Sequence, residues 1–341
     1  RGERGERYRG TMDLHAAFQA YAAAHLHPAA VVSAPRLANQ GWESEVYFFS
    51  LSLPGAPPEE RVLRLYASGN AEKARLEAGV MQRLHQAGYP VPRVDHLQPD
   101  PAPLGKPFII MEKIEGEVLW PLLYTPASIR QGEHMLRLFA QLYVRLHRLD
   151  WRPFSPSPAP APVSGLLDSW QPYLGLLPGG DFAPHWQWLR QRQASVRGAR
   201  PALIHFDFHA NNILIRPDGS PAVIDWTGAL VADPRYDLAW TLLLTEAYEG
   251  AEWRERILRA YEQEAGEAIS DLDFFDVAAC LRRLFSILVS QAQGAQSMGM
   301  RPGAEQGMLQ AEPIRRVYRR MLAHTALPVP AVEALLARIE G

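Results

Sequence analysis

The stretch that decides the fold runs from residue 203 to residue 226 and reads LIHFDFHANNILIRPDGSPAVIDW. It contains His205, then Asp207 two residues later, then Asn212 after a further five; Asp225 follows two apolar runs that a turn separates. A His-x-Asp-x4-Asn motif followed by a further aspartate is typical of phosphoryl transfer. In that chemistry the first aspartate accepts a hydroxyl proton, while the asparagine and the second aspartate hold Mg²⁺.

The turn between the two apolar runs predicts how the metal ligands meet. Asp218-Gly219 favours a two-residue type I′ turn, in which both central residues have positive φ. With these residues at the centre, Asn212 lies directly opposite Asp225, with the Cβ atoms about 4.5–5.5 Å apart on one face. We therefore expect an amide oxygen and a carboxylate to converge, with Asp207 a short loop away.

Composition excludes several classes of protein. The 341 residues include 35 basic and 37 acidic side chains, and a net charge of -2 lacks the basic surplus of nucleic-acid-binding proteins. Cys280 is the single cysteine, which excludes an internal disulfide and a thiolate zinc site. No apolar stretch reaches the roughly 18–20 residues of a membrane span. We expect a cytoplasmic monomer or homodimer that binds neither nucleic acid nor a membrane.

The pattern of elements changes along the chain. Two β-rich runs, 46–53 and 61–66, flank a proline-rich turn and predict a hairpin. Residues 70–87 have helical apolar spacing, and residues 107–111 form a buried-looking strand, after which helical patterns dominate. This order predicts an α+β protein with two lobes. The expected divisions are a disordered tail (1–11), a sheet-rich nucleotide-binding lobe with one main helix (12–111), a hinge (112–117) and a larger, mainly helical catalytic lobe (118–341).

The motif resembles that of the aminoglycoside phosphotransferase and choline kinase family, small-molecule kinases related to protein kinases. The resemblance rests on residues 205–212 and 224–226, and it extends through Asp233-Pro234 and residues 237–239. It implies a two-lobed protein-kinase-like fold, ATP or GTP as phosphate donor, and Mg²⁺. The roles it implies are catalytic base for Asp207, metal ligands for Asn212 and Asp225, and support of the catalytic loop for Asp237. His205 is itself more typical of a core residue that holds the loop by hydrogen bonds.

The first lobe matches that family less sharply. Residues 39–46 stand where the phosphate-covering loop would lie, and Ser44 could offer its hydroxyl or N–H group to a phosphate. The expected strand lysine is absent, and Arg64 occupies its place; a guanidinium can bridge phosphate and carboxylate. Its expected partner is Glu77 on the next helix, although the two could form only an ion pair. The remaining expected nucleotide contacts are the backbone groups of Glu112 and Ile114, at the hinge.

Some departures and alternatives remain. The family commonly has glycine where Phe206 stands, and proline-glycine where Ala210-Asn211 stand. Trp226 could contact substrate, but it and Trp240 are more typical of core packing.

Other activities also fit parts of the pattern. On a strand, His205, Asp207 and His209 would share a face and could bind a metal, as in a hydrolase; His209 could instead contact substrate or serve structure. A protein kinase of the same superfamily is disfavoured, because seven residues after Asp225 leave no room for an activation loop. A nucleotide-binding pseudokinase or interaction module is the third alternative. The expected acceptor is a hydroxylated small molecule, aminoglycoside-, choline- or sugar-like.

Overall fold

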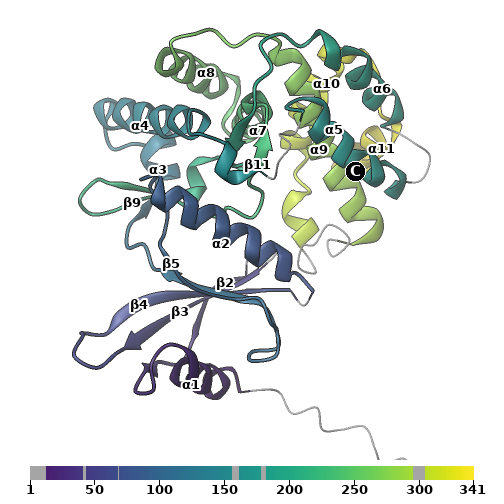
Figure 1. The fold of residues 1–341 in the computed structure, drawn as a ribbon. Helices are drawn as coiled ribbons and strands as arrows, with labels where there is room; N and C mark the ends of the chain where they lie inside the picture. Colours follow the sequence, from purple (N-terminus) through teal and green to yellow (C-terminus); the bar gives the residue numbers. More distant parts are fainter. Residues whose placement is uncertain (1–12, 41–43, 68, 156–160, 178–181, 295–303) are drawn as a thin grey trace, which may run out of the picture. The chain divides into compact units, whose positions relative to one another are not determined.

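The computed structural model describes residues 13–40, 44–67, 69–155, 161–177, 182–294 and 304–341. The tail expected at residues 1–11 lies outside the described residues. Contacts between Cα atoms divide the chain into two compact units, residues 1–79 with 92–113 and residues 80–91 with 114–341. The first unit is built on an antiparallel sheet and the second is mainly helical (Figure 1), which confirms the predicted α+β class.

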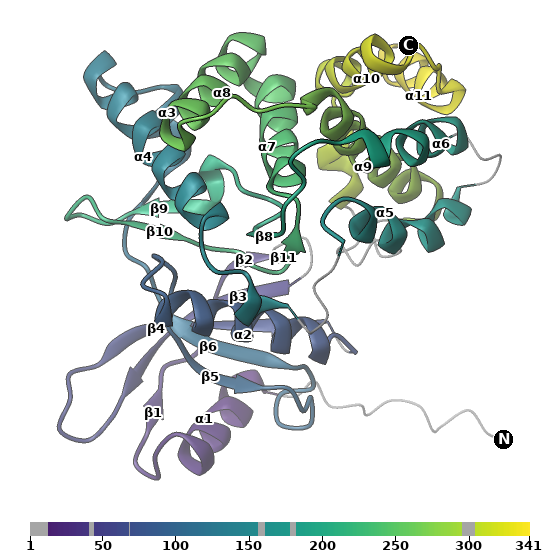
Figure 2. The same cartoon turned by 45° about the horizontal axis from the view of Figure 1, so that its top comes forward.

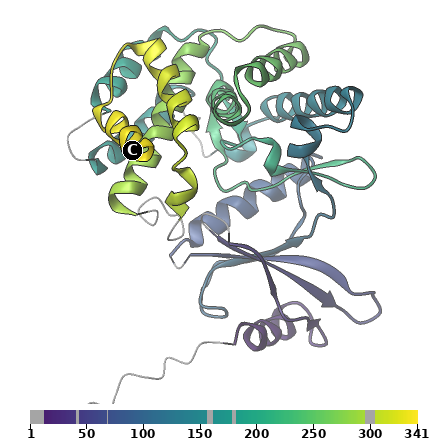
Figure 3. The ribbon, with the colours of Figure 1, turned by 180° about the vertical axis from the view of Figure 1, so that it is seen from behind.

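A six-stranded antiparallel sheet forms the first unit. The strand order is β1-β3-β4-β6-β5, with β2 paired to β3, so the hairpin predicted from the sequence is present as β3 and β4. Helix α1 covers one face of this sheet (Figure 3). The elements are α1 (Leu14–His25), β1 (Val31–Val32), β2 (Arg36–Gln40), β3 (Ser44–Ser52), β4 (Glu59–Tyr66), β5 (Val94–Gln98) and β6 (Phe108–Glu112).

Alternation along β4 decides which side chains face α1. Leu63 and Leu65 are fully or almost fully buried and pack with Phe18 of α1 and Phe108 of β6. Because successive strand residues point to opposite faces, Arg64 between these leucines points away from α1. That opposite face is where the helix carrying Glu77, α2 (Ala71–Gln86), supplies a partner.

Helices make up most of the second unit, together with two small sheets. The sheets have the orders β10-β9-β7 and β11-β8. Figure 2 shows α7 directly after β11 and next to α8 and α9. The larger elements are β7 (Glu117–Val118), α3 (Leu119–Tyr124), α4 (Ile129–His147), α5 (Ser164–Trp170), α6 (Ala183–Arg192), β8 (Ala202–Ile204), β9 (Ile213–Ile215), β10 (Pro221–Val223), β11 (Leu230–Ala232), α7 (Pro234–Glu249), α8 (Ala251–Ala265), α9 (Leu272–Gln293), α10 (Ala311–Thr325) and α11 (Pro330–Glu340).

A buried ionic cluster joins four of these helices. Asp276 on α9 accepts from Arg254 on α8 at 2.7 Å and from Arg320 on α10 at 3.0 Å. Arg320 also pairs with Glu246 on α7. Asp276 is 2% exposed, and on the same helix Cys280 is fully buried, as expected for a packing residue. Among the described residues, no helix has both the length and the apolarity needed to cross a membrane.

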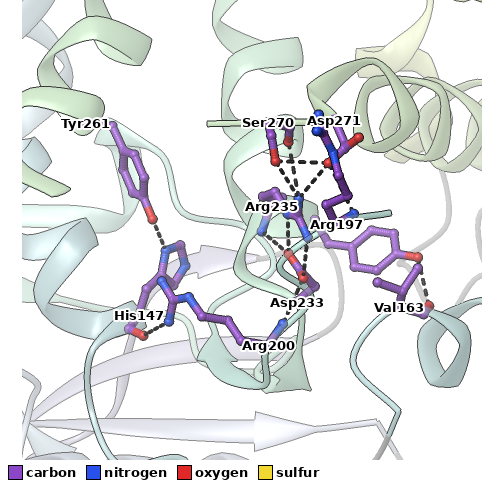
Figure 4. Close-up of polar contacts among 10 residues, drawn as sticks. His147, Val163, Arg197, Arg200, Asp233, Arg235, Tyr261, Ser270 and Asp271 are labelled. Atoms are coloured by element: carbon purple, nitrogen blue, oxygen red, sulfur yellow. Dashed lines mark hydrogen bonds and ion pairs between the residues drawn. The ribbon is translucent and has the colours of Figure 1, made fainter. Parts of the chain in front are cut away.

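Polar contacts fix the start of α7 (Figure 4). Asp233 caps the helix by accepting from the N–H of Arg235 at 3.0 Å. The guanidinium of Arg235 reaches both carboxylate oxygens of Asp233, at 2.8 and 2.9 Å, and the N–H of Arg200 donates to the same carboxylate at 3.2 Å. The first turn of α7 is therefore held firmly, and Asp237 lies in that turn.

Candidate active site

The hairpin that carries Asn212 and Asp225 differs in register from the expected one. β9 pairs with β10 so that Ile213 lies opposite Val223. Asn212 therefore lies opposite Ile224, whose N–H donates to the Asn212 carbonyl at 2.9 Å. The predicted direct opposition of Asn212 and Asp225 is wrong by one residue. Asp225 itself leaves the strand, with a φ of 65°.

The turn chemistry explains this shift. The loop has three residues, because the N–H of Arg216 donates to Ser220 O and the N–H of Gly219 donates to Arg216 O, both at 2.8 Å. Within the fully described loop, residues 217–219, Gly219 alone has positive φ, at 84°. The Asp218 carboxylate accepts from the N–H and hydroxyl of Ser220, at 2.9 and 2.7 Å. A three-residue loop needs one left-handed residue, and glycine takes that conformation without strain, whereas a type I′ turn would have required the aspartate to adopt it too.

One face of α7 holds the loop of residues 205–208. Asp237, Trp240 and Thr241 are three and four residues apart and so lie on the same side of the helix. The Asp237 carboxylate accepts from the first two loop N–H groups, each at 2.8 Å, and the Thr241 hydroxyl donates to a loop carbonyl. The Trp240 indole N–H donates to Asp207 Oδ1 at 2.9 Å. The core position expected for Trp240 is confirmed by its 7% exposure, but the sequence does not reveal the contact of its indole N–H with Asp207.

Phe206 stands where the resemblance noted above implies a glycine, and its φ is 66°. The left-handed conformation costs a residue with a Cβ atom about 1–2 kcal/mol. Two contacts hold Phe206 in it: Arg282 donates to its carbonyl at 2.8 Å, and Asp237 accepts from its N–H. The loop therefore has a left-handed backbone at this position, which a glycine would adopt without strain and Phe206 adopts at a cost.

Three of the expected polar groups meet around Asp207. Asn212 Nδ2 donates to Asp207 O at 3.0 Å and lies 3.5 Å from its Oδ2, while His209 Nε2 lies 3.3 Å from the same Oδ2. Asp225 follows Ile224, whose N–H bonds to Asn212 across the hairpin, and the charge of Asp225 contributes to the raised pKa of His209. The loop, the start of the hairpin and its end thus supply one polar cluster.

The electrostatics of this cluster keep Asp207 ionised. Burial alone would raise the pKa of Asp207, but His209, the indole N–H of Trp240 and the charge of Arg282 hold that pKa well below its usual range. Burial opposes a charge on His209, yet the carboxylates of Asp207 and Asp225 outweigh it and raise the pKa of His209. An ionised Asp207 can accept a hydrogen bond and then a proton from a hydroxyl group.

The donor set beside Asp207 fits a hard divalent cation. Because Asn212 Nδ2 is directed to a carbonyl, the amide oxygen of Asn212 is left for a cation. Asp225 Oδ1 accepts from the Thr227 hydroxyl at 3.0 Å, which orients the carboxylate. Amide and carboxylate oxygens are the ligands Mg²⁺ takes, usually with only one or two carboxylates from the protein.

The alternative metal site on His205, Asp207 and His209 gains no support. His205 Nε2 donates to Ile224 O at 3.0 Å, and its Nδ1 accepts from the N–H of Asp207 at 3.3 Å, so both ring nitrogens are engaged. Over the described part of the chain, no group of three or more His, Cys, Asp or Glu side chains is arranged to hold a metal ion. His205 instead ties the loop to the hairpin, in agreement with its expected supporting position.

The residues expected to bind nucleotide from the first unit include one buried pair. Arg64 Nη1 donates to Glu77 Oε1 at 3.0 Å, and the two residues are 8% and 1% exposed, so the predicted contact is present. The Tyr66 hydroxyl also donates to Glu77. Ser44 is the first residue of β3 and is 8% exposed, whereas residues 41–43 of the expected phosphate-covering loop lie outside the described residues.

The other expected contacts are placed as follows. Glu112 ends β6, and its N–H donates to Arg93 O at 2.9 Å. Ile114 is the first residue of the segment that belongs to the second unit. Trp226 is 1% exposed and its indole N–H donates to Val223 O at 2.9 Å, which favours packing over contact with substrate.

The sequence of this chain is similar to those of known proteins. Residues 34–272 match the model of the phosphotransferase enzyme family. Mouse acyl-CoA dehydrogenase family member 10 is 25% identical over an alignment of 237 positions that covers 60% of this chain; the chain spans only 20% of that protein.

Solved structures share the fold. A structure from Ralstonia eutropha JMP134, assigned to the aminoglycoside phosphotransferases, has a TM-score of 0.63 at 18% identity and covers 95% of this chain and 98% of its own. A thermostable mutant of aminoglycoside phosphotransferase APH(4)-Ia, in a ternary complex with AMP-PNP and hygromycin B, has a TM-score of 0.59 at 18% identity and covers 87% and 98%. Macrolide 2'-phosphotransferase MphH from Brachybacterium faecium has a TM-score of 0.54, also at 18% identity, with coverage of 83% and 96%.

Proposed function

Because the chain belongs to the phosphotransferase enzyme family, we propose that it transfers the γ-phosphate of ATP to a hydroxyl group of a small molecule. The observation that carries this proposal is the Asp207 carboxylate, which Trp240 fixes and which lies beside Asn212 and His209. A carboxylate that is held in place and kept deprotonated is suited to accept the proton of an attacking hydroxyl. Asp207 is therefore the proposed catalytic base.

Asn212 and Asp225 are the proposed ligands of Mg²⁺, because their oxygens fit the cation and lie in the same polar cluster. When bound, Mg²⁺ would neutralise charge on the nucleotide phosphates. His205 and Asp237 hold the loop that carries the base.

In the first unit we propose Arg64 as the residue that binds the nucleotide phosphates, held by Glu77. A guanidinium presents several donors, so it can contact a carboxylate and a phosphate together. The AMP-PNP in the APH(4)-Ia complex supports an adenine nucleotide as donor, with GTP as the alternative to test. The further proposed nucleotide contacts are Ser44, Glu112 and Ile114.

The acceptor is proposed to be a hydroxylated small molecule, aminoglycoside-, choline- or sugar-like. The hygromycin B in the APH(4)-Ia complex supports this class. The connection after Asp225 also disfavours a protein acceptor, because β11 begins at Leu230 and α7 at Pro234. That short connection leaves no room for the activation loop of a protein kinase.

The test is a screen of hydroxylated acceptors with ATP and with GTP, with and without Mg²⁺, that measures phosphate transfer to the acceptor. Asp207→Asn keeps the shape of the side chain but loses the base, so turnover is expected to fall about 10²–10⁴-fold. Binding of AMP-PNP by the same variant should stay close to that of the unchanged protein.

Three results would contradict the proposal. Full turnover by Asp207→Asn would remove the catalytic base. Nucleotide binding with no transfer to any acceptor would favour a pseudokinase. Transfer to a protein in the absence of a small acceptor would favour a protein kinase.

A further inference from the structure

An arginine lies against two aromatic rings next to the proposed base. The Cζ atom of Arg282, on α9, is 3.7 Å from the ring centroid of Phe206 and 3.8 Å from that of Trp240. Arg282 also donates to the Phe206 carbonyl at 2.8 Å. A guanidinium on an aromatic face is attracted by the electron density of the ring. Arg282 therefore fixes the positions of both rings, one on the catalytic loop and one on α7.

The left-handed residue Phe206 carries an aromatic ring that contacts Arg282. A glycine would adopt the φ of 66° without cost, but it would offer no surface to Arg282. The ring contacts Arg282 and also stacks with Trp170, with the ring centroids of Trp170 and Phe206 6.3 Å apart and the planes inclined by 21°. The Phe206 ring thus helps to hold Arg282, which in turn contacts Trp240.

The two oxygens of the Asp207 carboxylate have different surroundings. Oδ1 accepts from the Trp240 indole at 2.9 Å. Oδ2 has longer contacts, 3.3 Å to His209 Nε2 and 3.5 Å to Asn212 Nδ2. The Asp207 side chain is 41% exposed, so a substrate can approach it.

From this geometry, and resting on the proposed function, we propose that Trp240 is a positioning residue, held by Arg282, that engages Oδ1 of Asp207 and leaves Oδ2 as the oxygen that takes the acceptor proton. In the step itself the acceptor oxygen bonds to the γ-phosphorus, and the bond from that phosphorus to the β–γ bridging oxygen breaks. The hydroxyl proton passes to Oδ2, and ADP leaves. Trp240 touches none of the reacting atoms and acts through Asp207.

The chain offers a matched control for this role. The Trp120 indole N–H donates to the Glu249 carboxylate at 3.2 Å, near the other end of α7. Trp240→Phe and Trp120→Phe therefore remove the same kind of contact at two places. With the acceptor found by the screen, Trp240→Phe is expected to lower kcat roughly 10- to 100-fold, the loss of one hydrogen bond to a charged group. The KM for ATP should change little, and Trp120→Phe should keep kcat close to that of the unchanged protein.

Arg282 provides a second variant that leaves the indole N–H in place. Arg282→Met removes the charge and the carbonyl contact but keeps an apolar chain between the rings. We expect it to lower kcat by less than Trp240→Phe and again to spare the KM for ATP. If the two substitutions act through the same carboxylate, their effects on kcat will not multiply when combined.

A spectroscopic measurement tests the contact without activity. The indole ¹H–¹⁵N signal of Trp240 is identified by its loss in Trp240→Phe. In Asp207→Asn it should move upfield, because a hydrogen bond to a neutral amide is weaker than one to a carboxylate. The signal of Trp120 should stay in place.

The outcomes separate this inference from the proposed function. Three results would each overturn the positioning role while leaving phosphate transfer established. They are an unchanged kcat in Trp240→Phe, an equal loss of kcat in Trp120→Phe, and a Trp240 indole signal that does not shift in Asp207→Asn. Absence of turnover with every acceptor would instead overturn the proposed function, and the role of Trp240 with it.

Discussion

At the residue scale, Arg64 and Glu77 depend on each other, because both are buried and each balances the charge of its partner. Removing one partner of a buried pair costs about 3–5 kcal/mol, whereas replacing both with apolar side chains is often neutral. Arg64→Met is therefore expected to lower the urea midpoint of the first unit, and Arg64→Met/Glu77→Leu to recover most of the loss. A double variant as unstable as the single one would show that packing, not charge, sets the cost.

Site residues could be predicted from the sequence where the interacting residues lie close together along the chain. Asp207 and Asn212 belong to one short motif, and Arg64 stands on a strand next to the helix of its partner. Trp240 lies 33 residues from Asp207, and nothing in its neighbours along the chain indicates that its indole N–H reaches the carboxylate. Arg282 is farther still, so tertiary packing alone reveals these two residues.

At the scale of an element, Gly219 sets the register of the β9–β10 hairpin. Its φ is 84°, and nothing lies within 4 Å of the position that a Cβ atom would take. Gly219→Ala is therefore expected to lower the free energy of unfolding by about 1–2 kcal/mol, through the backbone conformation alone. Gly219→Asn should cost less, because asparagine tolerates the left-handed region. Urea denaturation of the two variants measures the difference; equal midpoints would contradict a backbone origin.

The β9–β10 hairpin also shows why the pairing register of two strands is harder to predict than the presence of the hairpin. Two apolar runs around Asp218-Gly219 indicate a hairpin, and they do so correctly. The loop has two residues if Asp218 adopts positive φ, and three if its carboxylate instead accepts from Ser220. The same sequence is compatible with both turns. The second choice moved Asp225 one residue out of direct opposition to Asn212.

At the scale of the molecule, the ionic cluster on α7, α8, α9 and α10 links stability to pH. Burial alone would raise the pKa of Asp276, but His324, Arg254 and Arg320 hold that pKa below its ordinary value. Asp276 therefore contributes its full stability above the unfolded-state pKa, about 3.9, and loses it as the pH falls through the lower folded-state pKa.

Asp276→Asn removes the buried carboxylate that Arg254 and the partly exposed Arg320 share, a loss of about 3–5 kcal/mol at neutral pH. The difference between the urea midpoints of the unchanged protein and the variant should narrow from pH 7 to pH 3. Below about pH 3.9 the Asp276 carboxyl of the unfolded chain takes up a proton that the folded protein binds more weakly, and this favours unfolding of the unchanged protein. A gap that stays constant with pH would exclude Asp276 as its origin.

The buried thiol of Cys280 has a practical consequence. It is the one cysteine in the sequence, it is fully buried on α9, and burial raises its pKa. A thiol reagent in solution therefore reacts at a single place, and only while α9 is transiently opened. The labelling rate, divided by the rate for the unfolded chain, gives the free energy of that opening. Asp276→Asn should speed labelling and Arg64→Met, in the first unit, should not, so a residue that only packs becomes a measure of how often the helical unit opens.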